Sequence, residues 1–126
     1  MLRACHRLLR PGGRLAFTTI HTPPGLAAEQ MQRADALGPP TVAEPQDHVE
    51  MLRVAGFVEP EQIDVTNAYL GTARAWFRER EAAAAELIGL EGEQAFRDRQ
   101  LELRNRIAGP EERIIGRSIL AARRPL

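Results

Sequence analysis

The chain has 126 residues, the size of one small domain. Its 17 basic residues, all of them arginine, balance its 17 acidic residues. The zero formal net charge excludes the strong overall attraction to nucleic acid that a basic protein has, and no run approaches the ~20 apolar residues of a membrane helix. A single cysteine, Cys5, has no partner for an internal disulfide, which favours a reducing, cytoplasmic compartment.

The first twenty residues predict a helix, a turn and a strand. Apolar residues recur at helical spacing over residues 1–10 and indicate an amphipathic helix. The Pro-Gly-Gly triplet at 11–13 ends this helix, because proline cannot continue it and glycine tolerates the positive φ angles of a tight reversal. Residues 15–20 form a short apolar and β-branched run that is typical of a buried strand. The apolar residues of the helix are Leu2, Cys5, Leu8 and Leu9.

Two further helices and a second strand follow. Residues 26–37 are expected to be helical and to end at the Gly-Pro-Pro of 38–40. Asp47 is suited to cap the free N–H groups of the next helix, which runs to about Ala55. Residues 63–67 alternate apolar and polar side chains, as a half-exposed strand does. The apolar positions of the two helices are Leu26, Met31, Ala34, Leu37, Val49, Leu52 and Val54.

The last part of the chain predicts two helices and a final strand. The first helix begins near Tyr69 and is expected to break at Gly89. The second covers about residues 92–107, and the Gly-Pro pair at 109–110 ends it. Residues 113–123 form the last strand, so the order of elements is typical of an α/β fold. The residues expected on the inner faces of the helices are Trp76, Phe77, Ala84, Leu87, Ile88, Phe96, Leu103 and Ile107.

Three segments resemble the class I S-adenosylmethionine (SAM)-dependent methyltransferase family. Residues 8–15, Leu-Leu-Arg-Pro-Gly-Gly-Arg-Leu, resemble the LRPGG segment that precedes strand five of that family. Residues 51–57, Met-Leu-Arg-Val-Ala-Gly-Phe, resemble the helix end before strand six, and residues 121–125 resemble the end of the last strand. The matches follow the order of the family and span nearly the whole chain, but they correspond only to the C-terminal half of the family's domain.

The resemblance implies an α/β fold, the C-terminal part of a Rossmann-like methyltransferase domain, with a small mixed three-stranded sheet and flanking helices. Residues 1–68 would supply helix, strand, helix, helix and strand. Residues 69–112 would be an inserted helical pair that caps a substrate pocket. Residues 113–126 would be a final strand, inserted antiparallel between the other two. The first strand would keep an unpaired edge, which invites a partner chain, a second copy of this chain or aggregation.

The resemblance also implies SAM as cofactor and a small-molecule methyl acceptor as partner. In the family, SAM is held mostly by the N-terminal half, where a glycine-rich loop follows strand one. This sequence contains no Gly-x-Gly, so we expect no cofactor-binding residue here and do not expect the chain alone to be catalytically competent. Met1 lies inside a helix whose family counterpart begins upstream, which favours a misplaced start codon or a truncated gene.

Three hypotheses for the function stay open. The first is a SAM-dependent methyltransferase whose SAM-binding half is missing from this chain. The second is a non-catalytic interaction module that pairs through its open sheet edge. The third is one half of a split methyltransferase, in which a separate polypeptide supplies strands one to four.

Thr19 and His21 lie at the C-terminal end of the first predicted strand, where open α/β sheets bind ligands. In the resembling family this position faces the acceptor, so His21 is a candidate to position or deprotonate the acceptor's nucleophile. The alternative is a solvated loop histidine before a Pro-Pro turn.

Tyr69 and Trp76 open the first long helix. Because inserted helices cap the substrate pocket in the resembling family, the two aromatic side chains are candidate substrate contacts. The alternative is that both pack the helix onto the sheet, which is the default for an amphipathic helix.

Other kinds of site have no support in the sequence. The three histidines show no metal-ligand spacing, so no metal site is predicted, and Cys5 is expected to pack as a small apolar residue. Ser118, the only serine, lacks the flanking glycines of a nucleophile elbow. No basic stripe with interleaved aromatic residues predicts a nucleic-acid partner, and the sequence identifies no catalytic residue.

Overall fold

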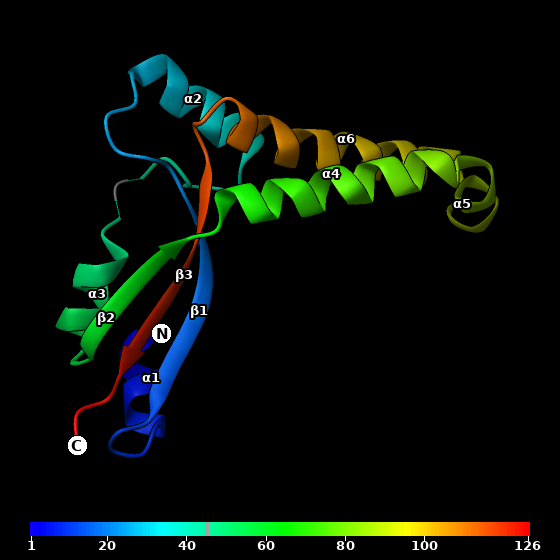
Figure 1. Ribbon diagram of the computed structural model, residues 1–126. Coiled ribbons are helices and arrows are strands. Elements are labelled where there is room, and N and C mark those ends of the chain that lie inside the picture. Colours follow the sequence, from blue (N-terminus) through cyan, green and yellow to red (C-terminus); the bar gives the residue numbers. More distant parts are fainter. Residues whose placement is uncertain (45) are drawn as a thin grey trace.

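The computed structural model describes residues 1–44 and 46–126, which form a small sheet, helices on one of its faces and a long helical arm (Figure 1). Within those residues, no helix combines the length and the apolar composition that a bilayer crossing requires. The elements are α1 (Leu2–Leu8), β1 (Arg14–His21), α2 (Ala28–Leu37), α3 (His48–Val54), β2 (Val58–Asp64), α4 (Thr66–Ala82), α5 (Ala84–Glu91), α6 (Glu93–Glu111) and β3 (Gly116–Arg123).

The sheet has the strand order β1-β3-β2. β3 runs antiparallel to both neighbours, so β1 and β2 point in the same direction without touching. This arrangement confirms the prediction that the last strand inserts antiparallel between the other two. β1 pairs only with β3 in the described part of the chain, so the outer edge of β1 is free.

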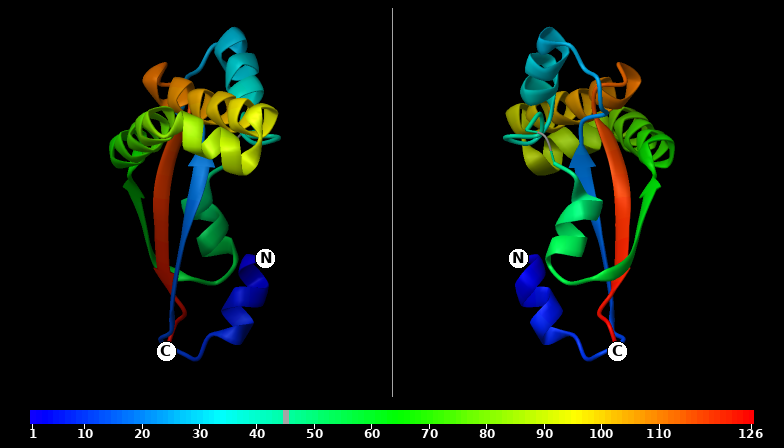
Figure 2. Two further views of the ribbon diagram at one scale, coloured as in Figure 1. Left: turned by 90° about the vertical axis from the view of Figure 1, so that its right-hand side faces the viewer. Right: turned by 90° about the vertical axis from the view of Figure 1, so that its left-hand side faces the viewer.

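Helices α1 and α3 lie on the same face of the sheet, which we call the covered face (Figure 2). Leu52 of α3 and Leu120 of β3 are completely buried there, and Phe57 is 3% exposed. The side chain of Asp47 accepts a hydrogen bond from the N–H of Glu50 at 3.0 Å, which confirms the predicted cap of α3. The partly buried residues that complete this core are Leu2, Cys5, Leu9, Leu15, Phe17, Val49 and Ala55.

The Pro-Gly-Gly turn between α1 and β1 is bound to the C-terminal segment. Gly12 has a φ of 77° and donates its N–H to the carbonyl of Arg124 at 3.0 Å. The guanidinium of Arg124 in turn donates to the carbonyls of His6, at 3.0 Å, and Leu9, which lie near the C-terminal end of α1. A cation at a helix C-terminus satisfies carbonyls that have no partner inside the helix, so the turn and the end of β3 hold each other in place.

A second apolar core joins α2 to the segment between α6 and β3. Ala34, Val42, Ile114 and Ile115 are buried together, and Leu26 and Leu37 pack against them. A Cβ atom built on Gly109 would lie 2.7 Å from Ile115 Cδ1, so the close approach of α6 to the start of β3 requires glycine at that position. This core fixes the C-terminal end of α6 next to the C-terminal end of β1.

The arm consists of α4 and α6, packed side by side, and α5 at their far end; it projects away from the sheet (Figures 1 and 2). Its apolar contacts come from one side chain in every one or two turns. The buried residues are Leu70 and Ala73 of α4 and Phe96 and Leu103 of α6.

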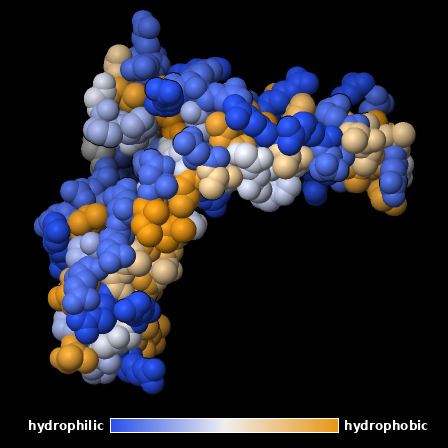
Figure 3. All heavy atoms as spheres, in the orientation of Figure 1, coloured by the Kyte–Doolittle hydropathy of each residue, from blue (hydrophilic) through white to orange (hydrophobic). Residues whose placement is uncertain are grey.

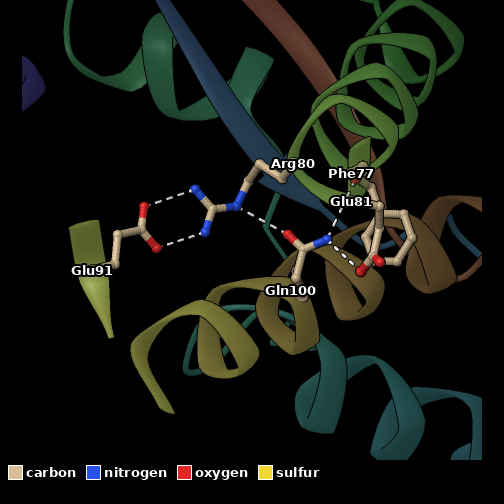
Figure 4. Close-up of polar contacts among 5 residues, drawn as sticks. All are labelled: Phe77, Arg80, Glu81, Glu91 and Gln100. Carbon is tan, nitrogen blue, oxygen red and sulfur yellow. Dashed lines mark hydrogen bonds and ion pairs between the residues drawn. The ribbon is translucent and has the colours of Figure 1, made fainter. Parts of the chain in front are cut away.

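A buried amide, that of Gln100, joins the two long helices (Figure 4). Gln100 is 5% exposed, and its Nε2 donates to Glu81 at 2.8 Å and to the carbonyl of Phe77 at 3.4 Å. Its Oε1 accepts from Arg80 Nε at 3.0 Å. The other two nitrogens of Arg80 bind Glu91 at 3.0 and 2.8 Å, so one connected network ties α4 to both α5 and α6.

The break at the tip of the arm was predicted at the wrong residue. α4 ends at Ala82, and Gly89 lies inside α5. A glycine inside a helix costs only about 1 kcal/mol of helix stability. The bidentate contact of Arg80 with Glu91 holds α5 against α4 and offsets this cost. Gly92, with a φ of 92°, ends α5 instead.

Several other boundaries and faces also differ from the prediction. α6 continues through Pro110 to Glu111; the proline lies in the last turn, so its missing N–H and its clash with the preceding turn disturb only the end of the helix. β2 covers Val58–Asp64 rather than residues 63–67, and β3 begins at Gly116 rather than at residue 113. Three apolar residues that were assigned to inner helix faces are exposed: Leu8 at 87%, Val54 at 64% and Trp76 at 49%.

Candidate functional site

Three of the four candidate site residues lie near the C-terminal end of β1, but not all on the same face of the sheet. Thr19 and His21 point toward the covered face, as the alternating burial along β1 shows. Tyr69, in the first turn of α4, lies against Arg117 of β3 on the opposite face. Trp76 lies two turns farther along the arm and is not brought to this end of the sheet.

His21 is held by two polar side chains that sequence reasoning missed. Its Nε2 lies 2.7 Å from the Oγ of Ser118, which is 1% exposed. The same Oγ accepts a hydrogen bond from Gln62 Nε2 at 3.2 Å. The Ser118 hydroxyl has one proton and two acceptor lone pairs, so it can accept from Gln62 and also bond to His21 Nε2. This hydrogen bond fixes the orientation of the His21 ring.

The ring of His21 requires a glycine on the neighbouring strand. Gly116 is paired with His21, and a Cβ atom at Gly116 would lie 2.9 Å from His21 Cε1 and 3.1 Å from Thr66 Oγ1. Thr66 holds the pKa of Asp64 below its ordinary value, first through its side chain and second through its N–H, which donates to Asp64 at 2.8 Å. The end of β2 therefore contributes an ionised carboxylate near His21.

A second histidine lies on the same face. Nε2 of His48, the first residue of α3, is 3.2 Å from Thr19 Oγ1. Burial of the ring lowers the pKa of His48, and the nearby His21 lowers it further, while Asp47 opposes the shift. His48 is therefore neutral at pH 7, and Thr19 serves to position it.

Two cavities meet at this end of the sheet. The first, which we call the arm cavity, has a volume of about 510 Å³ and lies between the end of β1, α2, α4 and α6. The second, the histidine cavity, also has about 510 Å³ and is lined by His21 and Asp64. The residues that line both are Pro110, Ile115 and Gly116. The polar residues of the arm cavity are Tyr69, Glu102, Asn105, Arg106 and Arg117.

The two aromatic candidates occupy different positions. The guanidinium carbon of Arg117 lies 4.4 Å from the centroid of the Tyr69 ring, inside the arm cavity. Trp76 lines a separate depression of about 280 Å³, which shares Glu102 and Arg106 with the arm cavity. Tyr69 thus belongs to the larger cavity, whereas Trp76 lies beside it.

The chain is similar to known proteins in its structure rather than in its sequence. No family model matches the sequence, and no curated protein does either. Phosphoethanolamine N-methyltransferase 2 of Haemonchus contortus superposes with a TM-score of 0.81 at 14% identity, over 99% of this chain and 29% of that chain. A putative sarcosine dimethylglycine methyltransferase of Galdieria sulphuraria gives 0.77 at 14%, over 98% and 46%. A cyclopropane synthase of Mycobacterium tuberculosis gives 0.74 at 16%, over 98% and 48%.

The chain has the fold of one part of the SAM-dependent methyltransferases. The resemblance inferred from the LRPGG and AGF segments is confirmed at the level of the fold. The chain spans about 29 to 48% of the length of these three structures, so most of each relative has no counterpart here.

The glycines at the Gly-Gly turn and beside His21 offer no open cradle for a nucleotide. Backbone glycines that leave room for a nucleotide are the usual cradle for such cofactors. At the Gly-Gly turn, however, the space beside Gly12 is filled by Leu126 at 3.1 Å and that beside Gly13 by Leu9 at 3.3 Å. The space beside Gly116 holds the ring of His21. Over residues 1–44 and 46–126, no three side chains of the metal-ligating types come together either.

Proposed function

We propose that this chain forms the acceptor-binding part of a SAM-dependent enzyme that methylates a small molecule, and that SAM is bound by residues outside this chain. The observation that carries the proposal is the junction of the arm cavity and the histidine cavity at the C-terminal end of β1. Ligands of open α/β sheets bind at the carboxyl ends of the strands. Residues of α4 and α6 line the arm cavity at this end, which supports a role of the inserted helices as a substrate cap.

The chain contributes positioning to methyl transfer. Orientation of the reacting groups supplies a large share of the rate when a bimolecular step becomes unimolecular. His21 is hydrogen-bonded to Ser118, which Gln62 holds in turn, and the His21 ring lies beside Gly116, which lines both cavities. This arrangement suits His21 to orient the acceptor.

A specific observation also supports the second and third hypotheses, in which this chain pairs with another. No helix of the described residues lies over the centre of the face opposite α1 and α3, which we call the open face, and apolar side chains gather there near the start of the arm (Figures 2 and 3). Ile63 is 53% exposed and Ile20 is 38% exposed on this face. Together with the free edge of β1, this surface is suited to the remainder of a methyltransferase domain, whether on the same polypeptide or on a separate one.

Calorimetry with SAM tests the proposal. We expect no saturable heat when SAM is titrated into the folded 126-residue chain. The complex recovered with the tagged chain from its source is expected to bind SAM and to transfer a labelled methyl group to a small molecule. Stoichiometric binding by the chain alone would contradict the missing SAM site. A complex that forms but binds no SAM would overturn the enzyme hypothesis and leave the interaction module.

Thr18→Pro provides a control for assembly through the edge of β1. The N–H of Arg124 donates to the carbonyl of Gly13 at 2.8 Å, and hydrogen-bonded pairs alternate along an antiparallel ladder. Thr18 therefore directs its N–H to the free edge, where proline removes a donor without disturbing the pairing of β1 with β3. The variant is expected to keep its fold and lose the partner, whereas Arg14→Ala at the start of the strand should retain it.

A further inference from the structure

The arm cavity contains one cation that has no carboxylate beside it. Three charged side chains line the cavity: Glu102, Arg106 and Arg117. Glu102 and Arg106 form an ion pair one helical turn apart on α6 and neutralise each other. Among the described residues, the guanidinium of Arg117 has neither an ion pair nor a hydrogen bond to a carboxylate. The cavity therefore carries one uncompensated positive charge.

The backbone of Arg117 is firmly held at the junction of β3 and α4. Its N–H donates to Thr66 Oγ1 at 3.0 Å, and its carbonyl accepts from the N–H of Val65 at 2.8 Å. The side chain is half-buried and lies opposite Ile20 of β1 on the open face. The Cα position from which the Arg117 side chain enters the cavity is therefore fixed.

The guanidinium of Arg117 lies over the ring of Tyr69, with 4.4 Å between the guanidinium carbon and the ring centroid. A guanidinium has five N–H donors, and in the described part of the chain no carboxylate is bound to those of Arg117. Planar N–H pairs match the two oxygens of a carboxylate or a phosphate, which is the strongest form of this contact.

Arg117 differs from the other arginines that have no ion pair with a carboxylate over residues 1–44 and 46–126, because most of those are exposed whereas Arg117 is half-buried. Arg33, Arg74 and Arg123 are each bound to a glutamate through two nitrogens. Those pairs lie on the outer surface, where solvent screens them. Arg117, by contrast, faces a cavity with no acidic partner, and a half-buried cation without a counter-charge is costly. A ligand with an acidic group would supply the missing charge.

We propose that the arm cavity binds the acidic group of the methyl acceptor, a carboxylate or a phosphate, through Arg117 stacked on Tyr69. This inference rests on the proposed function, because it takes the ligand of the cavity to be the acceptor. Asn105 lines the same cavity and adds an amide that can donate to the anion. The acceptor is then a small molecule anchored at its acidic end, with the methylated end toward the junction with the histidine cavity.

The experiment uses the folded, isotope-labelled 126-residue chain without SAM. Acetate, inorganic phosphate and, as a cationic control, methylammonium are titrated at constant ionic strength, and the Nε–H resonance of Arg117 and the ring resonances of Tyr69 are followed. We expect saturable shifts with acetate or phosphate and none with methylammonium. The anion that saturates at the lower concentration identifies the acidic group of the acceptor.

Variants decide whether the site is Arg117. Arg117→Gln is expected to weaken anion binding at least tenfold as followed by Tyr69, and Arg117→Lys, which keeps the charge but loses the planar fork, to weaken it less. Arg104→Gln is the matched control, because Arg104 stacks on Phe77 at 5.3 Å outside the cavity and should leave binding unchanged.

Unsaturable shifts in the native chain, or equal affinity in Arg117→Gln, would overturn the proposal. Because SAM is absent from the experiment, failure here leaves methyl transfer by the assembled enzyme standing. Conversely, anion binding by a chain whose complexes never bind SAM would separate this site from the methyltransferase function.

Discussion

The two faces of the sheet present the same kinds of side chain to very different surroundings. On β3, Leu120 points to the covered face and is completely buried, whereas its neighbour Ile119 points to the open face and is only half-buried. Across the sheet, Ile63 is paired with Ile119 and remains 53% exposed. The covered face is closed by α1 and α3, but the open face is closed by no helix of the described chain over its centre (Figure 2).

The difference teaches how the fold separates its apolar core from the surface that we propose binds an anion. The covered face supplies the core and places the hydrogen-bonded pair of His21 and Ser118 at its end. One residue before Ser118, Arg117 points to the open face and lies over the ring of Tyr69 of α4. Alternation along β3 thus puts the partner of His21 and the cation on opposite sides of one strand, and the two cavities meet around it.

Leu120→Ala should break the covered face and have the largest effect. Deleting a fully buried leucine removes its transfer energy and leaves a cavity, with a loss of about 2–5 kcal/mol of unfolding free energy. Ile63→Ala on the open face is the matched control and should cost less than about 1 kcal/mol, since solvent already reaches the side chain. Urea unfolding of both variants measures the difference. Equal losses would mean that the open face is also buried, for example by a second copy of the chain.

Gln100→Leu tests whether the arm, unlike the covered face, depends on a polar contact. Leucine fills a similar volume but leaves Arg80 Nε and Glu81 without the amide that joins them. Arg80 is half-buried, and leaving its Nε without a partner should cost about 1–3 kcal/mol, whereas the exposed Glu81 can bind water. Gln94→Leu, on the exposed face of α6 where the amide binds only Asp98, should stay within about 0.5 kcal/mol. Urea unfolding followed by the α-helical signal compares them, and a neutral Gln100→Leu would show that apolar packing alone holds the arm.

The sequence predicted the sheet better than the arm, for a physical reason. Helix periodicity, the Pro-Gly-Gly turn and the Asp47 cap are local features that depend on a few neighbouring residues. The break at Ala83 depends on the contact of Arg80 with Glu91, eleven residues apart, which no local pattern records. Gly89 does not end the helix as predicted, because a helix tolerates glycine when other contacts stabilise the turn.

Some residues of the candidate site could likewise be predicted from local sequence features, and others could not. Thr19, His21 and Tyr69 could be proposed because they follow or begin predicted elements, and their roles stay predictions. Ser118 and Arg117 were missed because both lie on β3, about a hundred residues from His21 in the sequence. The signal that would have found them is the antiparallel register: once β3 is placed beside β1, residues 116–118 must lie opposite residues 19–21.

Asp47→Ala is expected to loosen α3 and so weaken the helix that closes the covered face. The carboxylate of Asp47 satisfies the N–H of Glu50, and loss of such a cap typically costs about 1 kcal/mol. Asp47→Ser keeps an oxygen acceptor and should retain most of the stability. The urea midpoints of the two variants are to be compared at pH 7.5. If alanine and serine lose the same amount, the cap is not what holds α3 on the sheet.

Acid should weaken the covered face through His48, and this is the smallest effect expected. Burial is the main cause that lowers the pKa of His48 below its ordinary value of about 6.5. The unfolded chain therefore takes up the proton more readily, so unfolding free energy contributed by His48 falls as pH drops below about 6.5. The loss should be under about 1 kcal/mol, because solvent still reaches the ring.

Urea unfolding at pH 7.5 and 5.5 measures the effect of His48, with His48→Gln as the comparison, since glutamine keeps a polar partner for Thr19 without titrating. Asp64, Glu91 and Glu112 have lowered pKa values as well, but their contributions are lost at more acid pH and leave this window largely undisturbed. The native chain should lose more stability than His48→Gln between the two pH values. An equal loss in both would assign the acid sensitivity to another group, and the neutral histidine would then have no part in closing the covered face.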